Sequence, residues 1–188
     1  MESYIKNIHN QRISISGIII FLIVLDISVF AQASEPGNVN MWINGGFGFS
    51  TVGSLAGNAN FNLQINRFLF SVRTSAYAQK TGIFSGGDEF SDVAILFGIG
   101  TVDSDNFASV SVGIAKLSGS RYQAGGGGGF FSLGTRIPVK PVLGLAIESK
   151  LNIKLGNTFS IGFSPYIDIN KEQSLFCLTI CLGLGKLN

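Results

Sequence analysis

The chain has 188 residues, of which 46% are hydrophobic and only 13% are charged. Soluble domains carry about 25% charged residues, and this much apolar content excludes a disordered chain. The net charge of +2 and the scattered Lys and Arg residues exclude a nucleic-acid footprint. With 25 Gly, 16 Phe and only 4 Pro, the composition favours β-structure over a helical bundle.

The N-terminus shows the order of features that is typical of a secretory signal peptide. A basic region precedes the unbroken apolar run Ile18–Leu25, and the small-x-small site Ala31-Gln32-Ala33 follows it. A retained membrane helix is the alternative, but the run is shorter than the ~20 residues of a spanning helix, and Asp26 would lie inside it. We therefore predict cleavage after Ala33, which gives a signal peptide of residues 1–33 and a mature domain of residues 34–188.

From residue 39 onward, apolar residues alternate with small or polar ones in eight runs, and this period of two predicts β-strands. In Leu55–Ile65, for example, the large apolar side chains face one way and the Asn and Gln side chains face the other. The predicted strands span Val39–Ser50, Leu55–Ile65, Phe68–Gln79, Asp92–Gly100, Ala108–Ala115, Leu143–Ile153, Phe159–Ile169 and Leu175–Gly185.

The segment Phe131–Pro141 leaves two alternatives open. Its first residues alternate like a strand, yet Pro138 and Pro141 each lack the N–H group that a sheet ladder needs. The segment either extends the sixth strand across a bulge or belongs to the preceding loop. A barrel of ten strands has less support, because no second partner segment is free.

The residue types on the two faces indicate which face points outward. One face is almost entirely Phe, Ile, Leu and Val, which suits lipid, and the other is mostly Gly, Ser, Ala and Asn, which suits the crowded interior of a narrow barrel. The runs match the ~9–11 residues that a membrane-spanning strand needs. Connections near residues 66, 102–106 and 154–157 are short, whereas those at 80–90 and 119–140 are long, as in outer-membrane barrels. We predict an all-β fold: an eight-stranded antiparallel up-and-down transmembrane β-barrel in the bacterial outer membrane.

Five charged residues fall on the inward face of this predicted barrel and form a candidate polar network in its lumen. They are Arg73, Asp92, Glu148, Lys150 and Asp168. An isolated charge inside the barrel would be costly, so each needs a partner. We predict that Arg73 on the third strand pairs with Glu148 on the sixth and that the network blocks the channel. Separate solvation of each charge by lumen water is the alternative.

The C-terminal part carries a resemblance to a known family. The sequences Tyr166-Ile167-Asp168-Ile169-Asn170, Ser174-Leu175-Phe176 and Gly183-Leu184-Gly185-Lys186-Leu187 follow seven earlier alternating runs. With them, nearly the whole mature chain resembles small outer-membrane β-barrel proteins of the OmpA/OmpX-like eight-stranded type, and the tail is similar to members from Bacteroidetes. The resemblance implies an architecture and a lipid environment, and no particular biochemical role.

The mature chain lacks the residue patterns that common enzyme mechanisms need, so we predict no catalytic, cofactor-binding or metal-binding residues. The single histidine, His9, lies in the signal region, which leaves no imidazole as a general base. Asp88 and Glu89 are read as a solvated loop tip. Asp103 and Asp105 lack the twelve-residue ligand loop of a calcium site. The glycine run 125–129 lacks the Lys-Ser/Thr of a phosphate loop and is read as a flexible loop.

Cys177 and Cys181 share the inward face of the last strand. Four residues of strand separate them by about 13 Å, which is too far for a disulfide, so we predict two buried free thiols.

Two classes of function remain. The first is a monomeric structural or surface-interaction barrel with a side-chain-filled lumen, whose partners are the membrane lipid and an extracellular molecule that contacts loops 80–90 and 119–140. The alternative is a narrow, porin-like passive pore for small solutes. Nucleic acid is not an expected partner.

Overall fold

The computed structural model describes residues 39–51, 55–78, 87–103, 105–123, 134–156 and 158–186, all of them within the unit Ser34–Asn188. They form β1 (Val39–Ser50), β2 (Leu55–Ile65), β3 (Phe68–Ala78), β4 (Glu89–Val102), β5 (Asn106–Gln123), β6 (Thr135–Leu155), β7 (Phe159–Ile169) and β8 (Leu175–Lys186). Within these ranges no helix is long and apolar enough to cross a membrane. The predicted signal peptide and the glycine run 125–129 lie outside the described residues.

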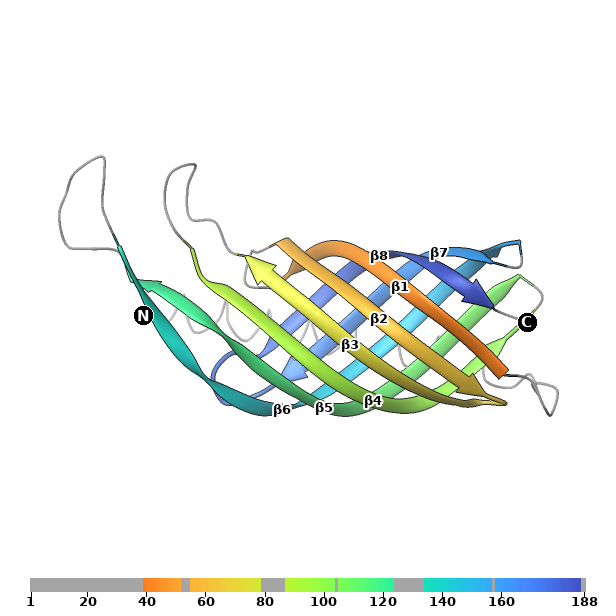
Figure 1. The fold of residues 1–188 in the computed structure, drawn as a ribbon, viewed down its shortest axis with the longest axis horizontal. Coiled ribbons are helices and arrows are strands. Elements are labelled where there is room, and N and C mark those ends of the chain that lie inside the picture. The colour runs from red at the N-terminus through yellow and green to blue at the C-terminus, as the bar shows by residue number, and fades with distance from the viewer. Residues whose placement is uncertain are drawn as a thin grey trace, which may run out of the picture. The chain divides into compact units, whose positions relative to one another are not determined.

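The eight strands form one closed antiparallel barrel (Figure 1). Each strand pairs with the next along the chain, and β1 pairs with β8 from Met41↔Lys186 to Ser50↔Cys177. The predicted up-and-down barrel of eight antiparallel strands is therefore confirmed. Closure removes every free sheet edge along the shared length of the strands.

The two ends of the barrel differ in their connections. Tight returns join β2 to β3, β4 to β5 and β6 to β7 at one end, which we call the turn end; the opposite end is the loop end. At the turn end, Asn66 has a φ of 56° and Gly156 a φ of 78°. Asn and Gly are the residues that adopt this left-handed conformation most readily, so the local sequence explains why the chain reverses here. The longer connections β3–β4 and β5–β6 lie at the loop end.

The alternation of the sequence sets the two faces of the wall. Along β2, Leu55 and Ile65 are 63% and 50% exposed on the outer face, whereas Asn60 and Asn62 are 1% and 0% exposed in the interior. The outer face of the described strands is mostly apolar, and Phe, Ile, Leu and Val are its main exposed residues. The predicted assignment of the two faces is thus confirmed in detail for this strand.

The structure extends the predicted fifth strand and supports one of the two alternatives for the sixth, its extension across a bulge. β5 runs to Gln123 and β6 begins at Thr135, so much of the predicted loop 119–140 is a two-stranded ribbon (Figure 1). The register shifts between Leu117 and Gly119, which is the bulge that one alternative required. Pro138 and Pro141 fit there because β6 pairs with β7 only from Leu145 onward, so this part of β6 has one free edge.

The ribbon is defined here as residues 118–123 and 135–141, and there is a physical reason why the sequence left its strands undecided. A bulge moves following side chains to the other face, so the alternation that identifies a strand breaks at that point. The β3–β4 connection is also shorter than predicted, because β4 begins at Glu89.

Gly113 shows how closely the strands approach in this narrow barrel. A Cβ atom added to Gly113 would lie 1.9 Å from the Ile95 carbonyl oxygen, so β4 and β5 would have to separate. We expect Gly113→Ala to lower the free energy of unfolding by about 1–3 kcal/mol, as overpacking does elsewhere. Gly45→Ala is the matched control, because a Cβ atom there meets nothing within 4 Å. Urea unfolding in detergent should separate the two variants, and equal stabilities would contradict the assigned close approach.

Candidate functional site

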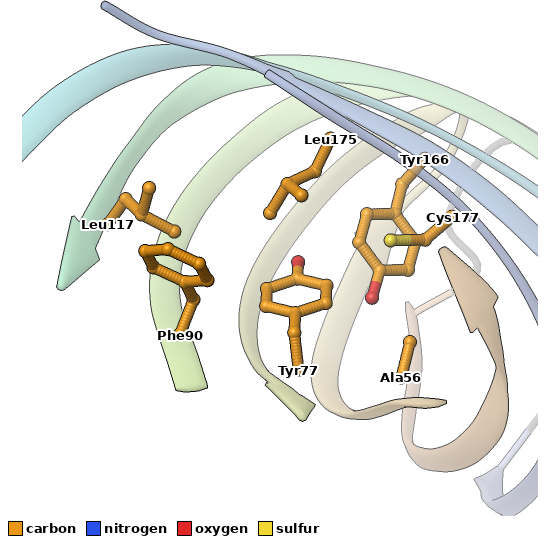
Figure 2. Packing of buried hydrophobic residues seen from close by; sticks show 7 residues of the cluster. All are labelled: Ala56, Tyr77, Phe90, Leu117, Tyr166, Leu175 and Cys177. Atoms are coloured by element: carbon orange, nitrogen blue, oxygen red, sulfur yellow. The ribbon is translucent and has the colours of Figure 1, made fainter. Parts of the chain in front are cut away.

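The interior of the barrel is filled in layers along its axis. At the loop end, an apolar layer of buried side chains comes from six strands: Ala56, Tyr77, Phe90, Leu117, Tyr166, Leu175 and Cys177. Figure 2 shows these side chains pointing inward from their strands toward one another. At the turn end, Trp42, Leu69 and Phe107 form a second apolar layer, in which the Trp42 and Phe107 rings meet edge to face at 4.7 Å. Arg73 on β3 lies between Leu69 and Tyr77 of the two layers, whereas Asp168 on β7 lies level with the loop-end layer, opposite Leu175.

Arg73 on β3 is the centre of the first charged group, and its side chain is fully buried. Its Nη2 atom donates to both carboxylate oxygens of Asp168 on β7, at 2.6 and 2.7 Å, and to Oδ1 of Asp92 on β4 at 3.2 Å. The Tyr77 hydroxyl donates to Asp92 Oδ2 and lies 3.3 Å from Asp168 Oδ2. The guanidinium carbon also lies 4.1 Å from the centre of the Tyr166 ring, a cation–π distance. This group joins β3, β4 and β7 across the lumen.

Lys150 and Glu148, both on β6, form the second charged group. Lys150 Nζ lies 3.5 Å from Glu148 Oε2 and donates to Asn62 Oδ1 on β2 at 2.6 Å. The Ser71 hydroxyl donates to the same Asn62 oxygen at 2.8 Å, and the Ser164 hydroxyl donates to Glu148 Oε1 at 2.8 Å. Five strands are therefore tied together in the barrel interior, because Asn62 also donates to Asn44 on β1.

The structure places all five sequence-predicted residues in the buried interior, but it does not form the predicted pair. No ion pair or hydrogen bond of the described residues joins Arg73 to Glu148. In a ring of eight strands, the strand opposite β3 is β7, four positions away, and not β6. Asp168 on β7 therefore meets Arg73 across the lumen. Glu148 instead has Lys150, two residues along the same face of its own strand.

Several members of the network were not predicted from the sequence, among them Tyr77 and Asn62. Both lie on the inward face of the predicted strands, so their orientation was readable from the alternation. Their hydrogen-bond partners could not be predicted from the alternation. Tyr77 contacts the carboxylate of Asp168, 91 residues away, and Asn62 accepts a hydrogen bond from the ammonium group of Lys150, 88 residues away.

The other candidate residues have structural contacts in the described part of the chain. Asp88 Oδ1 accepts the backbone N–H of Tyr122 at 2.7 Å, and Glu89 accepts two hydrogen bonds from Arg136, each at 2.7 Å. These contacts hold the β3–β4 connection and β4 against the ribbon. Both cysteines are free and buried, in agreement with the prediction. No group of three or more His, Cys, Asp or Glu side chains that could hold a metal ion occurs within the described ranges.

A closed barrel of eight antiparallel strands with an apolar outer wall and a filled, partly charged interior is the architecture of the small outer-membrane β-barrels. No family model matches the chain, and no curated protein matches it. Several solved structures, however, are similar to this chain. The N-terminal β-barrel domain of Pseudomonas aeruginosa OprF aligns with a TM-score of 0.56 at 10% identity, covering 80% of this chain and 99% of that one.

Two further proteins of known structure, both from other bacteria, are similar to this chain. Ail, the attachment invasion locus protein of Yersinia pestis, aligns with a TM-score of 0.52 at 12% identity, covering 81% of this chain and 99% of that one. Neisserial surface protein A aligns with a TM-score of 0.52 at 10% identity, covering 78% and 94%. Ail also has a structure in complex with the heparin analogue sucrose octasulfate, which aligns with a TM-score of 0.50 at 12% identity, covering 81% and 99%. The predicted likeness to small eight-stranded outer-membrane barrels is confirmed for the fold, and the likeness of the tail to Bacteroidetes proteins stays a prediction.

Proposed function

We propose that this protein is an integral outer-membrane β-barrel with a closed, side-chain-filled lumen, and that it acts through contacts at its loop end rather than through catalysis or conduction. The observation that carries the proposal is the layered interior. Arg73 and Lys150 lie between two buried apolar layers and are both 0% exposed, and Asp168, the partner of Arg73, lies level with the loop-end layer. A solute crossing the lumen would have to displace both layers and break the ion pairs between them.

The membrane location rests on the outer wall. Large apolar side chains such as Phe47, Phe97 and Leu143 are 73%, 58% and 67% exposed on it. Exposed apolar surface of this extent is unfavourable in water and favourable against lipid. The strands around it are eleven residues or longer, enough to cross a bilayer at the usual tilt.

A role for the loop end in surface contacts is supported by the ribbon. It carries β5 and β6 beyond the ends of their neighbours, and exposed ion pairs fix it: Arg136 with Glu89 and Arg121 with Glu172, the second at 3.7 Å. A projection of this kind, together with the connections between β3 and β4 and between β5 and β6, offers a site for an extracellular partner. The complex of Ail with a heparin analogue supports this reading for a barrel of the same fold.

We expect the protein to fractionate with outer membranes as a monomer after export with a cleaved signal peptide, and to show heat-modifiable migration on gels. A closed barrel resists detergent at room temperature and runs as a compact form until boiling unfolds it. Recovery of folded protein from the soluble periplasm without detergent would contradict the membrane location.

A narrow pore is the second candidate, and one observation favours it. The buried polar atoms of Asn60 and the hydroxyl of Ser75 have no protein partner within the described chain, and such atoms are usually satisfied by water. Water bound to these atoms would form part of a path through the lumen. The two apolar layers argue against a continuous path.

Planar bilayer recordings distinguish the two functions. We expect no single-channel steps from the purified barrel, because the interior is closed at both ends. A large porin inserted into the same bilayer supplies the positive control. Reproducible steps of one size from the pure protein would replace the filled-barrel proposal with the pore.

A further inference from the structure

Lys116 on β5 is an unusual residue for the outer wall. Its side chain is exposed on the apolar face, and its register partners on the two adjacent strands are Val93 and Leu143, which are 54% and 67% exposed. Ile114, two residues earlier on the same face, is 63% exposed. Other outward charges of the described strands lie at strand ends or in the ribbon. Lys116 is thus a cation set among lipid-type neighbours, near the loop end of the wall.

A second lysine lies close to the first. Lys140 is exposed on β6, within the irregular stretch where the register between β5 and β6 shifts. It is three residues along β6 from Leu143, the register partner of Lys116, so the two Cα atoms are separated by about 11 Å at the usual strand spacings. Each lysine side chain reaches about 6 Å, so both ammonium groups can approach one group between them.

Neither lysine has an ion pair or a hydrogen bond with the described residues, whereas nearby Arg136 is neutralised by Glu89. The two lysines therefore leave an uncompensated positive charge where the apolar outer wall approaches the loop end of the barrel. A cation in such a position is favourable where its stem lies along hydrocarbon and its ammonium group meets an anion at the membrane surface.

We propose that Lys116 and Lys140 bind the phosphate of a lipid headgroup in the leaflet at the loop end, while the acyl chains of that lipid cover Val93, Ile114 and Leu143. This inference rests on the proposed membrane location. An amphiphile is favoured over a free phosphate because the site is half apolar: the residues around Lys116 gain from contact with hydrocarbon, which a free anion does not supply. A phosphate suits the cationic part because its oxygens accept charge-assisted hydrogen bonds from two ammonium groups together.

The test measures lipid retention by native mass spectrometry of the full-length mature barrel released from mixed micelles. Phosphatidic acid, phosphatidylcholine and diacylglycerol with identical chains compete for the barrel. We expect preferential retention of phosphatidic acid and a loss of roughly fivefold in that preference for Lys116→Met and again for Lys140→Gln, the usual effect of one lysine near an anionic lipid surface. Lys186→Gln, a lysine at the turn end, is the matched control and should leave the preference unchanged. Inorganic phosphate should not displace the lipid.

Three results would overturn the inference. They are equal retention of the three lipids, an unchanged preference for phosphatidic acid in a variant that combines Lys116→Met and Lys140→Gln, or a loss of that preference in Lys186→Gln as large as in the other variants. Displacement by inorganic phosphate would show a site for a free anion and would also overturn it. Lys116→Met keeps the wall apolar and is therefore expected to fold; heat-modifiable migration checks this for each variant. Failure of the unaltered protein to enter bilayers would contradict the proposed function itself, whereas insertion without a lipid preference contradicts only this site.

Discussion

Arg73→Met is expected to destabilise the barrel by about 3–5 kcal/mol, because it leaves two buried carboxylates without their cation. Asp168 would lose hydrogen bonds of 2.6 and 2.7 Å, and Asp92 would lose one of 3.2 Å. Urea unfolding of the barrel in detergent or lipid measures the change. The methionine keeps most of the side-chain volume, so the loss reports the charge rather than a cavity.

A double-mutant cycle identifies the partner of Arg73. Adding Asp168→Leu to Arg73→Met should recover part of the lost stability, because it removes one of the two stranded charges. Adding Glu148→Leu should recover far less, because Glu148 contacts Lys150 and Ser164 instead. A larger coupling for the Glu148 cycle than for the Asp168 cycle would contradict the observed pairing.

Arginine on the outer wall is expected to be the second costly change. Phe97, Val112 and Ile180 are 58%, 51% and 45% exposed, each near the middle of its strand. We expect Arg at any of the three to lower stability in bilayers by about 2–4 kcal/mol, because a guanidinium near the midplane must be hydrated or moved. Leucine at the same positions is the control and should be tolerated. Unchanged folding into lipid with Arg at all three sites would show that this face does not contact lipid.

The sequence determines the wall of the barrel more completely than its interior. Leu55–Ile65 alternates without a break, so both the strand and its two faces follow from the period alone. The alternation fails at the bulge near Gly119 and at Pro138, so the fifth strand was predicted to end too early and the start of the sixth was left open between strand and loop. The reason is that pairing between β5 and β6, rather than the residues of either strand, holds this segment extended.

For the interior network, the sequence predicts which way a charged side chain points but not which residue it pairs with. The period of two shows that Arg73 and Asp168 point inward, but the partner of an inward charge depends on which strands face each other across the ring. These two residues are 95 positions apart in the chain. Counting strands around a ring of eight would have identified β7 as the opposite strand, so part of this information was available from the predicted topology.

The two thiols on the last strand allow closure of the barrel to be followed by chemical labelling. Cys177 and Cys181 lie opposite Ser50 and Gly46 of β1, in the seam between the first and last strands. They are 0% and 1% exposed, so a water-soluble alkylating reagent can reach them only while that seam is open. The rate at which the thiols become protected during refolding therefore measures seam formation directly. Because pairing of β1 with β8 closes the barrel, this protection is expected to appear together with detergent resistance and not before it.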